Sequence, residues 1–279
     1  MTSFGERVAG ALAAHGPLCV GIDPHEHLLA QWGLDVSAEG ARELGLRLVE
    51  AAAGRVGIVK PQVAFFERYG AVGFAALEDV LSAARAAGLL VIADAKRGDI
   101  GTTMDAYARA WLTPGSPLEA DALTVAPYLG VGALHETFAL ARDNGKGVFV
   151  LAATSNAEGA AVQLARAGTG TLAGEIVREV SEWNAAHATA APLASVGFVI
   201  GATVDRTRYG LPDGFAPAAP VLAPGFGAQG AEPADLARLF GALAPSVIAN
   251  ESRSILSAGP NGLEARIAER AALYGSMDG

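Results

Sequence analysis

The stretch Leu89-Leu90-Val91-Ile92-Ala93-Asp94-Ala95-Lys96-Arg97-Gly98-Asp99-Ile100-Gly101-Thr102-Thr103 passes from an apolar run into charge within a few residues. Residues 89–93 have the length and composition of a buried strand. A strand that ends this way would hold Asp94, Lys96 and Asp99 close together. Because unpaired buried charges are very costly, a core built only for stability has no use for such a cluster. The stretch therefore indicates a site that handles charge.

Short apolar runs of this kind recur along the chain and alternate with stretches of helical periodicity. The candidate strands are residues 18–22, 57–59, 89–93, 122–125, 147–152, 196–200, 221–223 and 247–249. The candidate helices between and after them are residues 41–53, 72–87, 103–111, 132–144, 172–187, 203–209, 233–243 and 262–274. Strands this apolar are buried on both faces, as in parallel sheets covered by helices.

Eight such strand–helix units predict an α/β fold, a (β/α)8 TIM barrel that forms one domain over residues 1–279. A helix over residues 4–14 would cap the bottom of the barrel. An open doubly wound sheet is the alternative, but it would usually carry a glycine fingerprint after the first strand, where this chain has Gly21-Ile22-Asp23-Pro24. Three segments exceed the minimal unit: residues 25–40, residues 154–171, which suit a mobile lid, and residues 205–219.

Composition narrows the class of protein. The chain has 279 residues, 51% of them hydrophobic and 18% charged, and a formal net charge of −9. Nothing in this balance suggests a nucleic-acid or anionic-membrane partner. No apolar run is long enough to span a membrane, no signal peptide is evident, and Cys19 is the single cysteine. We therefore expect a cytoplasmic protein without a disulfide framework.

In a (β/α)8 barrel the active site lies at the C-terminal ends of the strands. Polar side chains stand at most of these ends: Asp23, Lys60, Asp94 with Lys96 and Asp99, Ser155, Gln229 and Arg253. Lys60 and Lys96 are two of only three lysines in the chain, and lysine, unlike arginine, can readily give up a proton. Lys60, Asp94, Lys96 and Asp99 could alternate in sign around one small volume.

The last two strand ends are typical of a phosphate site. Residues 225–230 read Gly-Phe-Gly-Ala-Gln-Gly, and glycines let backbone N–H groups approach an anion. Arg253, after the final strand, could grip a phosphate through two donors. Structural alternatives stay open at this point: a salt-bridge network that closes the barrel mouth, Asp23 as a cap of the next segment, and Lys60 as a rim residue. The histidines show no shared metal-ligand spacing.

The pattern Asp-x-Lys-x-x-Asp-Ile-x-x-Thr, here Asp94, Lys96, Asp99, Ile100 and Thr103, resembles that of the orotidine 5'-phosphate decarboxylase family. The resemblance extends to Asp23, Lys60, Gln229 and Arg253, and therefore covers nearly the whole barrel. Three local forms, residues 59–62, residues 95–99 and residues 154–156, are similar to the divergent second type of this enzyme.

The resemblance implies loss of CO2 from orotidine 5'-phosphate to give UMP, the last step of pyrimidine nucleotide synthesis, with no metal or organic cofactor. Lys96 would protonate C6 and Asp94 would lie beside the substrate carboxylate. Lys60 and Asp23 would hold the ribose, Ser155 the pyrimidine edge, and Gln229 and Arg253 the phosphate. Asp99, Ile100 and Thr103 would reach into the site of a second subunit, so the implied form is a homodimer with shared active sites.

One departure from the family pattern concerns the phosphate site, where Ser252-Arg253 replaces the Gly-Arg of many members. Three other functions remain open on the same barrel. A sister phosphosugar enzyme would use the acids to hold Mg²⁺. A Schiff-base aldolase would use Lys60 or Lys96, although acidic neighbours raise a lysine pKa and so oppose this. A non-catalytic barrel would bind the nucleotide unchanged.

Overall fold

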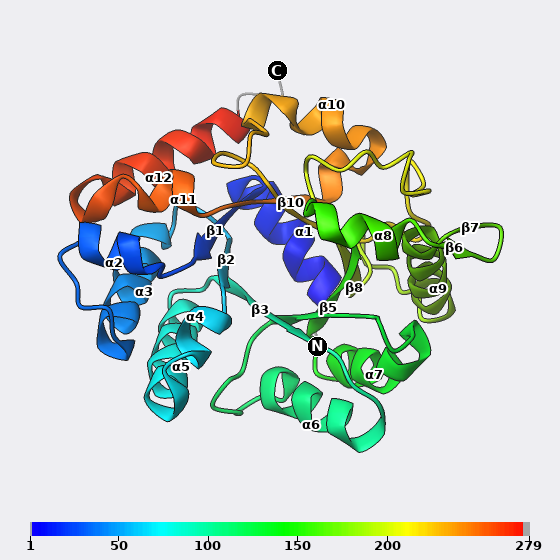
Figure 1. Ribbon diagram of the computed structural model, residues 1–279, viewed down its shortest axis with the longest axis horizontal. Coiled ribbons are helices and arrows are strands. Elements are labelled where there is room, and N and C mark those ends of the chain that lie inside the picture. The colour runs from blue at the N-terminus through cyan, green and yellow to red at the C-terminus, as the bar shows by residue number, and fades with distance from the viewer. Residues whose placement is uncertain (1, 276–279) are drawn as a thin grey trace.

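The computed structural model describes residues 2–275 and shows a closed barrel of eight parallel strands inside a ring of helices (Figure 1). Around the barrel the strands are β1 (Leu18–Ile22), β10 (Val247–Glu251), β9 (Val221–Pro224), β8 (Val196–Ile200), β5 (Gly147–Ala153), β4 (Ala122–Val125), β3 (Leu90–Arg97) and β2 (Ile58–Pro61). Pairing of β1 with both β2 and β10 closes the sheet, which confirms the predicted TIM barrel and excludes the open-sheet alternative.

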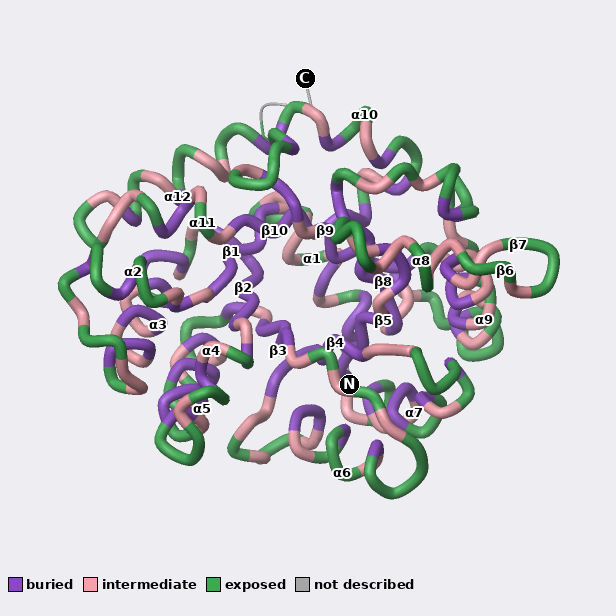
Figure 2. Tube along the Cα trace, in the orientation of Figure 1, coloured by how far each residue is buried: buried purple, intermediate pink, exposed green. Residues whose placement is uncertain are grey.

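Residues 2–275 form twelve α-helices, and most of them cover the outside of the barrel with their inward faces buried together with the strands (Figure 2). They are α1 (Phe4–His15), α2 (Glu26–Gln31), α3 (Ala38–Ala52), α4 (Ala64–Glu67), α5 (Gly70–Ala86), α6 (Gly101–Leu112), α7 (His135–Asp143), α8 (Ala160–Gln163), α9 (Leu172–Ala186), α10 (Leu236–Phe240), α11 (Arg253–Leu256) and α12 (Gly259–Gly275). No helix within residues 2–275 has the length and apolarity that crossing a membrane requires.

Helix α1 closes the bottom of the barrel, as the sequence predicts. Ser3 and Glu6 form a capping box that satisfies free N–H groups at its start. Phe4 is fully buried and packs edge-to-face on Phe149, with ring centroids 5.9 Å apart. Gly147 leaves room for this ring, because a Cβ there would lie 2.1 Å from a ring carbon of Phe4.

Several strand boundaries differ from the prediction, and in β2, β3 and β10 the difference brings charged residues into the strand; β10 runs on to Glu251. Strand β2 includes Lys60, and β3 runs through Asp94 and Lys96 as far as Arg97. Strand β3 has a register shift against β4 between Ala93 and Arg97. The charged residues therefore belong to the strands themselves: Lys60 lies in a regular ladder with β1, and Lys96 lies at the irregularity between β3 and β4.

The predicted helix at residues 203–209 is wrong, because turns without an α-helix connect β8 to β9. The carboxylate of Asp205 accepts the backbone N–H of Arg208 at 3.1 Å, and Gly210 has a φ of +68°. Local bonds of this kind compete with a continuing helix.

The two other long segments form ordered elements. Residues 25–40 contain α2, after which the Trp32 indole donates to the Leu256 carbonyl at 3.0 Å, so this segment packs on α11. Residues 154–171 contain α8 and the hairpin of β6 (Arg166–Ala167) with β7 (Gly170–Thr171). Their role as a lid stays a prediction.

Candidate active site

The barrel interior is arranged in layers, and the lower layer is apolar. Each strand contributes one side chain to it: Cys19, Ile58, Ile92, Ala122, Phe149, Val199, Leu222 and Ile248. Phe4 and Val8 of α1 pack against this layer from below. Because successive side chains of a strand alternate between its two faces, the residue two positions further on also points inward.

The next layer has a polar half and an apolar half. The polar half consists of Lys60, Asp94, Thr124 and Asn250 on β2, β3, β4 and β10, and all four are buried. Leu151 on β5 and Pro224 on β9 form the opposite half. This division places the charge on neighbouring strands, where the groups can pair.

Asp94 is the centre of the polar half, with a side chain that is 10% exposed. Its Oδ2 accepts from Lys60 Nζ at 2.8 Å and from Gln62 Nε2 at 2.9 Å. Its Oδ1 accepts from Lys96 Nζ at 2.6 Å and from the Thr124 hydroxyl at 3.0 Å. Four donors therefore fix the carboxylate, as a buried charge requires.

Burial and charge act in opposite directions on this cluster. Burial alone would raise the pKa of Asp94, but the ammonium groups of Lys60 and Lys96 outweigh it and hold that pKa well below its usual range. Burial would likewise lower the pKa of Lys60, but the carboxylates of Asp94 and Asp23 raise it above its usual range. Both groups are therefore ionised at neutral pH.

A pocket of about 590 Å³ opens above this cluster, within the usual size range of small-molecule sites. It lies at the C-terminal mouth of the barrel, where parallel-barrel enzymes bind their substrates. Its floor is formed by Leu151, Val199 and Leu222, and its polar lining includes Lys96, whose side chain is 45% exposed. The one strongly exposed cation of the cluster thus faces the space where a ligand would lie.

The pocket collects most of the residues predicted for the site. Asp23, Lys60, Asp94, Lys96, Ser155 and Gln229 all line it. The Oδ1 atom of Asp23 is buried and has no hydrogen-bond partner within residues 2–275, so it is available to a ligand.

Four predicted residues lie outside the pocket of their own chain: Asp99, Ile100, Thr103 and Arg253. The carboxylate of Asp99 accepts its neighbouring backbone N–H, that of Ile100, at 2.8 Å. Within residues 2–275 the expected cluster of four charges therefore has three members, Lys60, Asp94 and Lys96. Strand β3 ends at Arg97, and Asp99, which is half-buried, lies in the segment between β3 and α6. Arg253 is exposed at the start of α11.

The glycine loop after β9 is a tight structure, and its predicted binding of phosphate stays a prediction. Gly225, Gly227 and Gly230 have φ values of +118°, +68° and +104°, which side chains rarely adopt. A Cβ on Gly227 would also lie 2.6 Å from the Ser254 hydroxyl. Two of the loop's N–H groups, of Gly227 and Gly230, donate within the loop, so it offers fewer free donors to an anion than its glycine count suggests.

Sequence reasoning assigned no role to three polar side chains around the charge cluster: Gln62 and Asn250, which line the pocket, and Thr124, which is fully buried and is not part of the lining. Gln62 and Thr124 hydrogen-bond to Asp94, and the Oδ1 atom of Asn250 is buried beside the pocket without a partner within residues 2–275. The available signal was strand alternation, because Thr124 and Asn250 lie two positions after the buried interior residues Ala122 and Ile248.

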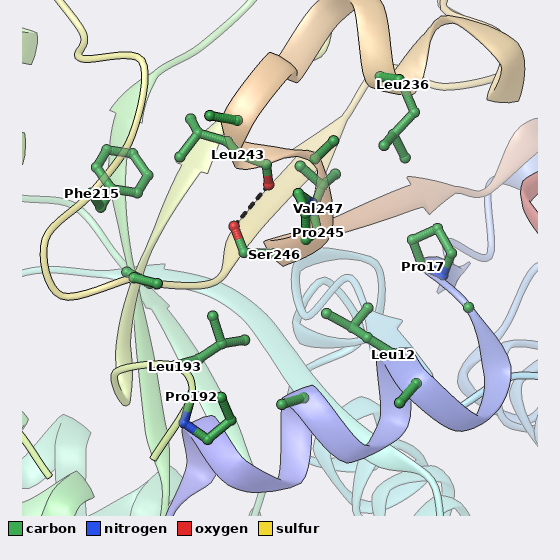
Figure 3. Close-up of a pocket in the computed structure, with 18 of the residues that line it drawn as sticks. Leu12, Pro17, Pro192, Leu193, Phe215, Leu236, Leu243, Pro245, Ser246 and Val247 are labelled. Carbon is green, nitrogen blue, oxygen red and sulfur yellow. Dashed lines mark hydrogen bonds between the residues drawn. The ribbon is translucent and has the colours of Figure 1, made fainter. Parts of the chain in front are cut away.

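A larger cavity of about 840 Å³ lies at the opposite, N-terminal mouth, between α1 and the segments that precede β8, β9 and β10 (Figure 3). Its lining is apolar, with Leu12, Leu193 and Leu243 among its residues. The Ser246 hydroxyl in it donates to the Leu243 carbonyl at 2.8 Å. The smaller pocket is the better candidate for chemistry, because it alone of the two contains paired charges.

Within residues 2–275 no group of three or more His, Cys, Asp or Glu side chains is placed to hold a metal ion. The absence of a cofactor stays a prediction.

Comparison with known proteins agrees with this site. A model of the "Orotidine 5'-phosphate decarboxylase / HUMPS family" matches residues 16–267. The orotidine 5'-phosphate decarboxylase of Salinispora arenicola is 53% identical over 99% of this chain and 100% of its own length. That of Streptomyces coelicolor is 51% identical over 94% of this chain and 92% of its own.

Solved structures give the same result. A Streptomyces avermitilis protein assigned as an orotidine 5'-phosphate decarboxylase superposes with a TM-score of 0.93 at 46% identity, over 99% of this chain and 96% of that one. The OMP decarboxylase of Leishmania donovani has a TM-score of 0.74 at 30% identity, over 98% of this chain and 99% of its own. From the extent of these matches, the chain belongs to the orotidine 5'-phosphate decarboxylase family.

Proposed function

We propose that this protein converts orotidine 5'-phosphate to UMP and CO2, the last step of pyrimidine nucleotide synthesis, as a cytoplasmic enzyme of one domain without a cofactor. The observation that carries the proposal is the Lys60–Asp94–Lys96 cluster, with the Lys96 ammonium facing a pocket of nucleotide size. It is supported by family membership and by relatives of that name at 46–53% identity.

The chemistry requires a cation at the reacting carbon. When the bond between C6 and the carboxylate breaks, its electron pair stays on C6, where the pyrimidine ring delocalises it poorly. The Lys96 ammonium stabilises this developing charge and then donates a proton to C6, after which the neutral amine takes a proton from solvent. Lys96 is held in place for this role before substrate arrives, because its Nζ already lies 2.6 Å from Asp94 Oδ1.

The polar and apolar halves of the pocket suit different parts of the substrate. Asp94 would lie beside the substrate carboxylate, whose negative charge it repels, and loss of neutral CO2 relieves that repulsion. Leu151, Val199 and Leu222 offer an apolar surface to the pyrimidine ring and to the departing CO2. Ser155 would contact the pyrimidine edge.

The ribose and phosphate would extend toward β1, β9 and β10. The unpartnered Asp23 Oδ1 and the Lys60 ammonium suit ribose hydroxyls. Gln229 of the glycine loop and Arg253 of α11 would bind the phosphate, with Ser252 in place of the glycine common in the family. Closure of residues 154–171 over the substrate would let remote phosphate binding contribute to the chemical step.

The finer assignment to the divergent second type rests on residues 59–62, which read Val-Lys-Pro-Gln. Two residues of this form act together in the structure, since Lys60 and Gln62 both donate to Asp94 Oδ2. A glutamine at this place thus belongs to the same charge cluster as the lysine.

A second copy of the chain would complete the site. Ile100, 60% exposed, and Thr103 face outward at the start of α6. Tyr128, 81% exposed, and Leu129 protrude from the loop after β4, the neighbouring strand. Large apolar side chains gathered on one face are typical of an interface. In the proposed homodimer, Asp99, Ile100 and Thr103 enter the partner's pocket.

The shared site predicts complementation between two inactive variants. Lys96→Ala and Asp99→Ala homodimers should each be inactive, while a heterodimer of the two keeps one site with both residues intact. Equal mixing with subunit exchange should restore about one quarter of wild-type activity. Native mass spectrometry, which resolves the heterodimer from both homodimers by mass, verifies the exchange, and a mixture that exchanges but stays inactive contradicts the shared site.

The test of the function itself is incubation of the purified protein with orotidine 5'-phosphate and EDTA. UMP should form at the rate measured without EDTA, because Lys96 supplies the positive charge that a metal would otherwise provide. Loss of UMP formation in EDTA would instead favour a Mg²⁺-dependent enzyme. Inactivation by borohydride in the presence of substrate would favour a Schiff-base enzyme. Binding of UMP without any decarboxylation of orotidine 5'-phosphate would favour a non-catalytic barrel.

A further inference from the structure

The backbone of Lys96 has an unusual conformation. Its φ is +49°, and it is the only non-glycine residue within residues 2–275 with a positive φ. Side chains rarely adopt this left-handed region, and strained residues of this kind persist only where their surroundings hold them. Lys96 lies where β3 loses register with β4, so the regular ladder does not hold it. Some other contact must do so.

Thr124 on β4 makes that contact. Its hydroxyl oxygen accepts the Lys96 backbone N–H at 2.9 Å, and the same hydroxyl donates to Asp94 Oδ1 at 3.0 Å. Thr124 is fully buried, so no water competes for either bond. The hydroxyl has a single proton, which goes to the carboxylate, and its lone pairs remain for the N–H.

These bonds close a ring around the proton donor. Asp94 Oδ1 receives both the Thr124 hydroxyl and Lys96 Nζ, while Thr124 holds the backbone of the same lysine. Both ends of Lys96 are thus fixed through one oxygen atom of Asp94 and one hydroxyl. Gln62, the other uncharged donor to Asp94, bonds to Oδ2 and does not contact Lys96 in this way.

We infer that Thr124 is a positioning residue for decarboxylation: it holds Lys96 in the left-handed conformation that aims the ammonium at C6. This inference rests on the proposed function. The hydroxyl has a second effect after proton transfer. When Lys96 becomes a neutral amine, Asp94 Oδ1 loses its charged partner, and the Thr124 donor remains to keep the carboxylate ionised and in place.

The test compares Thr124→Val with Thr124→Ser. Valine keeps the shape and removes the hydroxyl, whereas serine keeps the hydroxyl and removes a methyl group. We expect kcat to fall about 10- to 100-fold in Thr124→Val, with KM changed less than about threefold, because a displaced proton donor slows chemistry more than binding. Thr124→Ser should keep kcat within about threefold of wild type.

A purely structural role for Thr124 predicts the reverse order. In that case the Thr124→Val variant, whose side chain fills the same space, keeps its kcat. The Thr124→Ser variant, whose smaller side chain leaves a gap, loses more of its kcat. Equal losses in both variants, or a raised KM with unchanged kcat, would also overturn the inference. Thr137→Val is the matched control, because Thr137 on α7 is equally buried and its hydroxyl has no partner within residues 2–275. Its kcat should be unchanged.

A second measurement does not depend on activity. The chain has three lysines, so [¹⁵N,¹³C]lysine labelling gives three backbone amide signals, and Lys96→Arg assigns one of them by its loss. The Lys96 amide should exchange slowly and report a positive φ in wild type and in Thr124→Ser, and lose both features in Thr124→Val. If the valine variant does not fold, a fast-exchanging Lys96 amide in wild type overturns the inference.

The two readouts separate this inference from the proposed function. If wild type fails to decarboxylate orotidine 5'-phosphate, the function is refuted, while the amide signals still report whether Thr124 holds Lys96. If wild type is active and Thr124→Val has the same kcat, the proposed function stands and the positioning role of Thr124 is refuted.

Discussion

Replacing Lys96 with alanine is expected to reduce kcat by at least about 10⁴-fold, since in the proposed mechanism it removes both the general acid and the charge that stabilises the carbanion. Affinity for UMP should fall much less, because Asp23, Ser155 and Gln229 still line the pocket. Steady-state kinetics and titration calorimetry with UMP give the two numbers. Retention of more than a few per cent of turnover would refute the proton-donor role.

Lys96→Arg separates charge from proton donation. Arginine keeps a cation near C6 but does not readily release a proton. We expect this variant to bind UMP and to remain nearly as inactive as Lys96→Ala. An active arginine variant would mean that the residue acts through its charge alone and that the proton comes from elsewhere.

Replacing Asp94 with asparagine should lower the free energy of unfolding by about 3–5 kcal/mol at pH 7, because it removes the carboxylate that is ion-paired with the buried Lys60 ammonium and leaves only the unpaired Asp23 nearby. Asparagine keeps the size of the side chain, so the change is mainly electrostatic. Denaturant unfolding measures the loss. Asp79→Asn is the control: Asp79 pairs with Arg42 at the surface, where a lost ion pair costs about 1 kcal/mol or less.

The pH dependence of stability should change sign in this variant. In wild type the raised pKa of Lys60 means that the folded chain holds its proton more tightly, so stability falls as the pH rises above about 10. The lowered pKa of Asp94 makes stability fall as the pH drops below about 4.

In Asp94→Asn, burial without the carboxylate lowers the pKa of Lys60, and the unfolded chain then binds more protons. Stability should therefore rise with pH between about 7 and 10. If the free energy of unfolding is constant or falls over this pH range, loss of the Asp94 carboxylate does not lower the pKa of Lys60.

The sequence predicts the barrel and most of the pocket, because both depend on short-range patterns. Short apolar runs such as residues 147–152 are typical of strands in a parallel sheet that helices cover on both faces. Polar residues that follow such runs meet at the C-terminal mouth of the barrel. That is why Asp23, Lys60, Asp94 and Lys96 could be assigned to the pocket from the chain alone.

Features that depend on exact geometry could not be predicted. The bulge that gives Lys96 a positive φ arises from how β3 meets β4, and no residue near Lys96 marks it. Thr124 looks like an ordinary strand residue until Asp94 is placed beside it. Asp99 is close to Asp94 and Lys96 in sequence, but it lies beyond the end of β3 and its carboxylate accepts the backbone N–H of Ile100 instead of an ammonium group of the cluster.

Within residues 2–275, the apolar floor of the barrel and helix α1 beneath it close the pocket from the N-terminal side. Cys19, Ile58 and Phe149 with their neighbours separate the two mouths, and Phe4 fills the space below. In the proposed mechanism, orotidine 5'-phosphate, UMP, CO2 and the solvent proton that returns to Lys96 would therefore all pass through the C-terminal mouth. CO2 would form on the closed side of the pocket, between the apolar floor and the bound UMP, and the release of the two products would be coupled.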